Sequence, residues 1–110
     1  MIDFAAVIAL VKGLEEAELR RWIAERWVQP EAAPSGYVFH EVDVARIRLI
    51  LELRQELAIG EEALPVVLQL LDQVYGLRRR LRALYQVIDA QPPEIREALR
   101  ERLLGAAKDE

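Results

Sequence analysis

The sequence predicts an all-α fold, in which a winged helix-turn-helix unit with a small β wing precedes a long coiled-coil helix and a short C-terminal helix. Apolar residues recur at helical spacing along most of the 110 residues. Residues 27–39 instead combine Pro, Ser and Gly with aromatic and β-branched residues, which is typical of a hairpin. Apolar residues between 67 and 88 alternate steps of three and four, which is typical of a coiled coil. We expect a single domain over residues 1–110, divided into a winged unit (1–59), a long helix (60–91) and a C-terminal helix (92–106).

The first two helices are predicted at residues 4–12 and 15–26. Asp3 is a suitable N-cap for the first helix, and Gly13 is a suitable stop. Only Leu14 separates Gly13 from the second helix, so the two helices should form a tight helix-turn-helix.

The wing is predicted from two β-prone pieces, residues 27–28 and 37–39, on either side of a turn rich in Pro, Ser and Gly. A third helix is expected at residues 41–57. Only a narrow stripe of this helix is polar (Arg48, Glu52 and Gln55), so other elements must cover it on more than one side.

Residues 58–60 link to the long helix, which should begin near Glu61 with Pro65 at the edge of its first turn. Its apolar seam consists of Val67, Leu70, Val74, Leu77, Leu81, Leu84 and Ile88. The seam could pair with a second copy in an antiparallel homodimer, or it could pack under the last helix, which carries Ile95, Leu99 and Leu103. We favour the homodimer. The last helix is expected at residues 93–104, with a stop at Gly105 and a frayed tail over residues 106–110.

The composition limits the functions that the chain can have. Fifteen Lys and Arg against nineteen Asp and Glu give a net charge of −4, the wrong sign for a dedicated nucleic-acid binder. The absence of cysteine and the single histidine, His40, argue against a metal site. The single serine, Ser35, has no base nearby in the sequence, and the glycines are scattered. We therefore expect no enzyme and no cofactor. No membrane span or signal peptide is visible, so a cytoplasmic location is expected.

Several segments resemble known families. Residues 36–47 resemble the passage from wing to helix in MerR-type winged-helix proteins, and residues 13–22 resemble their second helix. Residues 27–30, 52–59 and 62–73 are similar to the CbpM group of chaperone modulators within that superfamily. The similarity extends over about residues 13–84. It implies a protein that binds the J-domain of a DnaJ-like co-chaperone of the CbpA type, competes there with DnaK, and uses neither catalysis nor a cofactor. The alternative is a MerR-type DNA-binding transcription regulator.

Three acids at the start of the second helix distinguish these alternatives. Glu15, Glu16 and Glu18 would repel phosphate at the end of the helix that enters the major groove in MerR-type readers. The same acids would also suit the positive end of the helix dipole. In the wing, Val38 stands where many DNA-binding relatives place Arg, and residues 30–35 contain no Lys or Arg. The resemblance implies a basic J-domain helix as partner, so the predicted contact residues are Glu15, Glu16 and Glu18, with Trp22 or the wing as apolar support.

The only basic cluster is Arg78, Arg79, Arg80 and Arg82, which flanks the seam of the long helix. It is either a solvated flank of the coiled coil or a binding site for an acidic partner. It lies far along the chain from the second helix, so it does not favour DNA binding.

Overall fold

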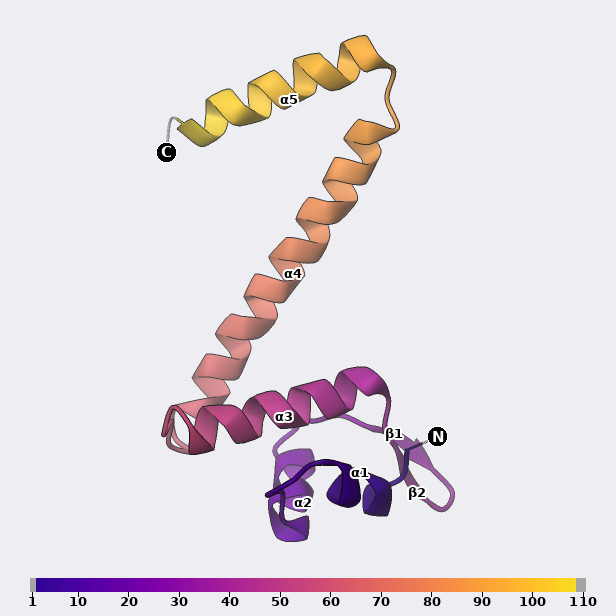
Figure 1. Ribbon diagram of the computed structural model, residues 1–110, viewed down its shortest axis with the longest axis vertical. Coiled ribbons are helices and arrows are strands. Elements are labelled where there is room, and N and C mark those ends of the chain that lie inside the picture. Colours follow the sequence, from indigo (N-terminus) through magenta and orange to yellow (C-terminus); the bar gives the residue numbers. More distant parts are fainter. Residues whose placement is uncertain (1, 109–110) are drawn as a thin grey trace. The chain divides into compact units, whose positions relative to one another are not determined.

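The computed structural model describes residues 2–108, which form five helices and one two-stranded antiparallel sheet (Figure 1). The all-α class with a small β wing is thereby confirmed. The elements in chain order are α1 (Phe4–Leu10), α2 (Glu16–Ala24), β1 (Glu31–Ala33), β2 (Gly36–Val38), α3 (Glu41–Gln55), α4 (Leu64–Asp89) and α5 (Pro93–Lys108). The chain divides into two compact units, a winged unit that ends at Gln69 and a helical unit that begins at Leu70.

The helix-turn-helix of the winged unit has the predicted caps. The Asp3 carboxylate accepts a hydrogen bond from the Ala6 N–H at 2.8 Å, so Asp3 is the N-cap of α1 as expected. α1 ends at Leu10, two residues earlier than predicted. Gly13 has φ +86°, a backbone conformation that strains residues with a Cβ, and this explains why a glycine stands in the turn before α2.

The wing differs from the prediction in its first strand. β1 and β2 pair from Glu31↔Val38 to Ala33↔Gly36 around a tight turn. The prediction of a strand at residues 27–28 was wrong. Trp27 and Val28 are buried in the core instead, and the Trp27 carbonyl accepts a hydrogen bond from the Arg46 side chain. That carbonyl is therefore hydrogen-bonded to a side chain of α3 and is not part of a β ladder.

The core of the winged unit gathers around α3. Its fully buried side chains come from all parts of the unit: Val7, Leu19, Trp22, Val28, Phe39, Ile47, Ile50 and Leu64. Each buried apolar side chain of this size contributes about 1.5–3 kcal/mol. Five residues of α3 are buried, and they lie on more than one side of the helix, as its narrow polar stripe predicted: Val44, Ile47, Ile50, Leu51 and Leu53. Leu64 and Leu68 extend the core into the first turns of α4.

The helical unit contains the rest of α4 and α5. An ion pair between Asp89 and Arg100, at 2.6 Å, joins the two helices near the Pro92–Pro93 corner. α5 continues through Gly105 to Lys108, so the predicted stop at Gly105 and the frayed tail were wrong for residues 106–108. One glycine costs a helix about 1 kcal/mol, and the alanines that follow are good helix formers, so the helix continues. The remaining tail, residues 109–110, lies outside the described residues.

Candidate partner-binding surface on the winged unit

The start of α2 presents an acidic end to solvent. Glu15 is the N-cap residue of α2, and Glu16 occupies its first turn; both are exposed. Carboxylates are favourable here because the first turn of a helix carries unpaired N–H groups and a partial positive charge. Glu16 pairs with Arg20 one turn later at 3.4 Å, in an exposed contact that contributes little to stability. The side chains of Glu15 and Glu16 therefore remain exposed to solvent.

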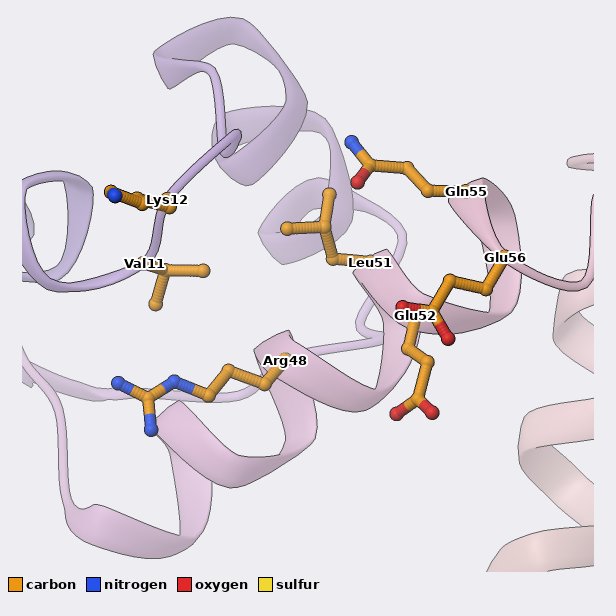
Figure 2. A pocket seen from close by; sticks show the side chains of 7 residues that line it. All are labelled: Val11, Lys12, Arg48, Leu51, Glu52, Gln55 and Glu56. Carbon is orange, nitrogen blue, oxygen red and sulfur yellow. The ribbon is translucent and has the colours of Figure 1, made fainter.

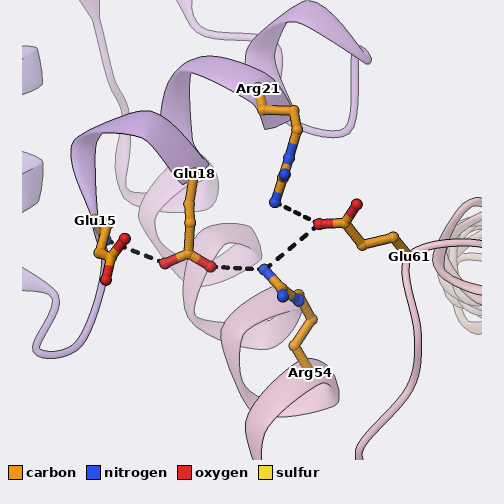
Figure 3. A network of polar contacts seen from close by, with 5 residues as sticks. All are labelled: Glu15, Glu18, Arg21, Arg54 and Glu61. Atoms are coloured by element: carbon orange, nitrogen blue, oxygen red, sulfur yellow. Dashed lines mark hydrogen bonds and ion pairs between the residues drawn. The ribbon is translucent and has the colours of Figure 1, made fainter.

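Glu18 has a different role from the other two acids. One of its carboxylate oxygens accepts the Glu15 N–H at 3.2 Å, as part of a capping box. The other oxygen accepts a hydrogen bond from Arg54 of α3 at 2.6 Å, and the two side chains are only 19% and 29% exposed (Figure 3). Both oxygens of Glu18 thus have partners within the winged unit, where they fasten α2 to α3.

The network continues through Glu61, in the turn before α4. Glu61 forms an ion pair with Arg54 at 3.8 Å and also pairs with Arg21 of α2 (Figure 3). Arg20, besides its contact with Glu16, lies 4.7 Å from the centre of the Phe4 ring. Both cations at the middle of α2, Arg20 and Arg21, therefore have acidic partners. The sequence shows these charges but does not indicate how they pair, because Glu61 lies forty residues from Arg21.

Trp22 lies beneath α2 rather than on its surface. Its side chain is 0% exposed, so the expectation that Trp22 would support a partner directly is corrected. The residue follows Glu18 and Leu19 by one turn of helix, on the face that packs into the core. Its indole Nε1–H has no hydrogen-bond partner among residues 2–108.

The wing has no cationic side chain. Residues 27–45, which contain β1 and β2, include no Lys or Arg. Val38 is half-buried, and His40 at the base of the wing lies 3.1 Å from the Glu31 carboxylate. Residues 1–69 carry twelve acids against seven Lys and Arg, a net charge of −5. The net charge of this unit has the same sign as the phosphates of a DNA duplex.

A shallow hollow of about 300 Å³ lies between the α1–α2 turn and α3. Figure 2 shows Val11 and Leu51 turned toward each other across it. Its rim is polar and of mixed charge: Lys12, Arg48, Glu52, Gln55 and Glu56. The polar stripe predicted on the third helix thus forms one wall of this hollow. The opposite wall comes from a turn some forty residues earlier, and for this reason the sequence did not reveal the hollow.

The predicted seam of α4 is largely uncovered. Leu70, Val74, Leu77, Leu81 and Leu84 are between 43% and 61% exposed. Val67 is half-buried, and Ile88 is only 4% exposed, so the expectation that Ile88 is open to a second copy is corrected. The alternative that α5 covers the seam within the chain does not hold here. α5 has no buried residue, and Ile95, Leu99 and Leu103 are themselves exposed.

The part of the chain that the structure describes shows neither a metal site nor a membrane-spanning helix. Among residues 2–108, no group of three or more His, Cys, Asp or Glu side chains is placed to hold a metal ion. Within that range no helix is both long and apolar enough to cross a membrane.

α1, α2, α3 and the β1–β2 wing together form a winged helix-turn-helix, the architecture of a class of regulatory proteins. The family model described as MerR HTH family regulatory protein matches residues 5–86, most of the chain, and the chain therefore belongs to this family. No curated protein and no solved structure gives a significant match.

Proposed function

We propose that this protein is a chaperone modulator, which binds the J-domain of a DnaJ-like co-chaperone of the CbpA type and restrains its action with DnaK. Membership of the MerR family supports the fold on which this proposal rests. The choice of a J-domain as the partner rests on the resemblance of residues 27–30, 52–59 and 62–73 to the CbpM group. The protein would act by binding, without catalysis and without a cofactor, in its expected cytoplasmic location.

The main support is the charge distribution of α2. Glu15 and Glu16 are exposed at its start. Glu16 pairs with Arg20 in an exposed contact, and Arg21 pairs with Glu61 of the same unit. The end of the helix that a DNA reader would direct at phosphate therefore presents carboxylates to solvent. Such a surface is complementary to a basic protein helix, and charge complementarity of this kind sets specificity and association rate.

Titration calorimetry of the full chain with the J-domain of a CbpA-type co-chaperone tests the proposal. We expect saturable binding with a dissociation constant near the micromolar range or tighter, which DnaK reduces by competition. No heat of binding at high micromolar concentrations, or binding that DnaK leaves unchanged, would contradict the proposal.

A DNA-binding transcription regulator is the second candidate, because the family description itself names a helix-turn-helix regulator. A gel shift with duplex DNA at increasing salt distinguishes the two. Phosphate contacts make binding fall steeply with salt, so a clean shift at low salt that disappears at high salt would favour this candidate. We expect no such shift, because the winged unit has a net charge of −5 and a wing without cations.

We also propose that the protein is a homodimer, in which the exposed seam of α4 packs against the seam of a second copy. A stripe of five large apolar side chains spaced three and four residues apart is unfavourable in water and is typical of a helix that pairs with another. Sedimentation analysis of the full chain tests this proposal directly: a monomer at all accessible concentrations would contradict it.

A further inference from the structure

α4 carries a second stripe beside the apolar seam. Two tyrosines and two arginines follow one another at steps of three, four and three residues: Tyr75, Arg78, Arg82 and Tyr85. We call this set the Tyr/Arg stripe. Each member directly follows one member of the seam, which there consists of Val74, Leu77, Leu81 and Leu84. Because one residue turns an α-helix by about 100°, the Tyr/Arg stripe lies beside the seam and not within it.

The arginines of this stripe differ from four arginines elsewhere in the chain that have an acidic partner. Arg20, Arg21, Arg54 and Arg100 each pair with a carboxylate. Within residues 2–108, Arg78 and Arg82 form no ion pair, and both are exposed. They lie four residues apart, a spacing at which like charges destabilise a helix. Tyr75 and Tyr85, at the two ends, are 44% and 46% exposed.

We propose that the Tyr/Arg stripe binds an acidic segment of a partner protein. Arginines four residues apart place their Cβ atoms about 5–6 Å from each other, which matches two carboxylates on one face of a helix. The planar guanidinium binds a carboxylate through two hydrogen bonds, and tyrosine contributes apolar area with a hydroxyl at its tip. Arg and Tyr are also the side chains enriched in protein interfaces. Binding would relieve the repulsion between Arg78 and Arg82.

This partner is distinct from the one proposed above. A J-domain presents a basic helix, which the Tyr/Arg stripe would repel, whereas the acidic start of α2 would attract it. The inference therefore goes beyond the proposed function and does not depend on it. It assigns the chain a second surface of opposite charge, on a different structural unit.

The charge balance favours a short protein segment over a nucleic acid. The stripe covers eleven residues of helix, or about 15 Å from its first residue to its last, so it offers few contacts to a phosphate backbone. Nucleic-acid binding at physiological salt usually requires several phosphate contacts. A short acidic segment can bind the stripe alone.

Fluorescence anisotropy with the full chain tests the proposal. The probe is a labelled synthetic helical peptide whose glutamates lie in pairs four residues apart. We expect saturable binding, weakened at least tenfold by the double substitution Arg78→Glu and Arg82→Glu. The matched control, Arg80→Glu with Arg102→Glu, changes the net charge equally but lies off the stripe, and it should weaken binding less than threefold. Circular dichroism establishes that both variants keep their helices.

Three outcomes would overturn the proposal. The first is no saturable binding of the peptide by the unaltered protein. The second is equal weakening by the two double variants, which would indicate a general charge effect. The third is tighter binding of a single-stranded oligonucleotide of equal charge, which would make the occupant a nucleic acid. J-domain titration of the same variants should be unchanged, so the outcome for the stripe is separate from the outcome for the proposed function.

Discussion

Arg54 of α3 donates to Glu18 of α2 at 2.6 Å, in an ion pair whose side chains are only 29% and 19% exposed. Glu18 also accepts the Glu15 N–H, so a single carboxylate both caps α2 and fastens it to α3. The position of the acidic end of α2 therefore depends on Glu18, which is itself half-buried.

Removal of the Arg54 side-chain charge should destabilise the winged unit. We expect Arg54→Met to lower the free energy of unfolding by about 1–3 kcal/mol, because Glu18 is then left half-buried without its cation. Arg20→Met removes an exposed pair instead and should cost less than about 0.5 kcal/mol. Urea denaturation followed by circular dichroism measures both. Equal effects of the two substitutions would show that the enclosure of Glu18 has no energetic consequence.

Charge reversal at the start of α2 should weaken J-domain binding. We expect Glu15→Lys with Glu16→Lys to raise the dissociation constant about tenfold, or about 1.4 kcal/mol, mainly through slower association. Glu18 is left intact, because its reversal would break the bond to Arg54. Glu94→Lys with Glu97→Lys on α5 changes the net charge equally and is the control. If titration calorimetry gives the same affinity for all three proteins, the acidic end of α2 is not the contact surface.

The seam of α4 can be tested by placing a charge in it. Leu77→Glu with Leu81→Glu should shift the protein to a monomer, because two unpaired charges would have to be buried in each half of the interface. We expect at least a hundredfold weaker self-association in analytical ultracentrifugation. Ala83→Glu lies on the same helix but off the seam and should leave association unchanged. Loss of the dimer in Ala83→Glu as well would point to a general effect of charge on α4.

Trp22 should tolerate the loss of its indole nitrogen. Its Nε1–H is buried without an acceptor in the described part of the chain, so Trp22→Phe removes an unpaired donor together with some packing. We expect this variant to unfold within about 1 kcal/mol of the unaltered protein, whereas Trp22→Ala should cost about 3–5 kcal/mol. Chemical denaturation measures the free energy of unfolding of both variants. A cost for Trp22→Phe as large as that for Trp22→Ala would mean that the donor has a partner in solution.

The sequence predicted those features that depend on local patterns. The cap at Asp3, the glycine in the turn at Gly13 and the covered sides of α3 all follow from the spacing of a few neighbouring residues. The prediction of the first strand was wrong because it relied on the high strand propensity of Trp27 and Val28. Their side chains are buried in the core instead. Gly105 predicts a stop because glycine often ends helices, but glycine is also tolerated inside them, and α5 continues through it.

The candidate site was less accessible to sequence reasoning. The exposed acids Glu15 and Glu16 could be predicted, because carboxylates at the start of a helix face solvent. The burial of Trp22 and the engagement of Glu18 could not, since the first depends on packing of the whole winged unit and the second on Arg54, thirty-six residues away. The same holds for Ile88, whose heptad position is that of its exposed neighbours, although the fold covers it.

The network of Glu18, Arg54, Glu61 and Arg21 bears on how such a domain could change its ligand during evolution. To release Arg21 for a phosphate, a lineage would have to lose Glu61; Arg54 would then retain only Glu18. Loss of Glu18 would in turn leave Arg54 without a carboxylate and α2 without its capping box. No single substitution in this network converts the surface into one that reads DNA, because Glu15 and Glu16 still present carboxylates at the start of α2 when Arg21 is released. The four paired charges therefore favour a protein ligand over DNA during further evolution.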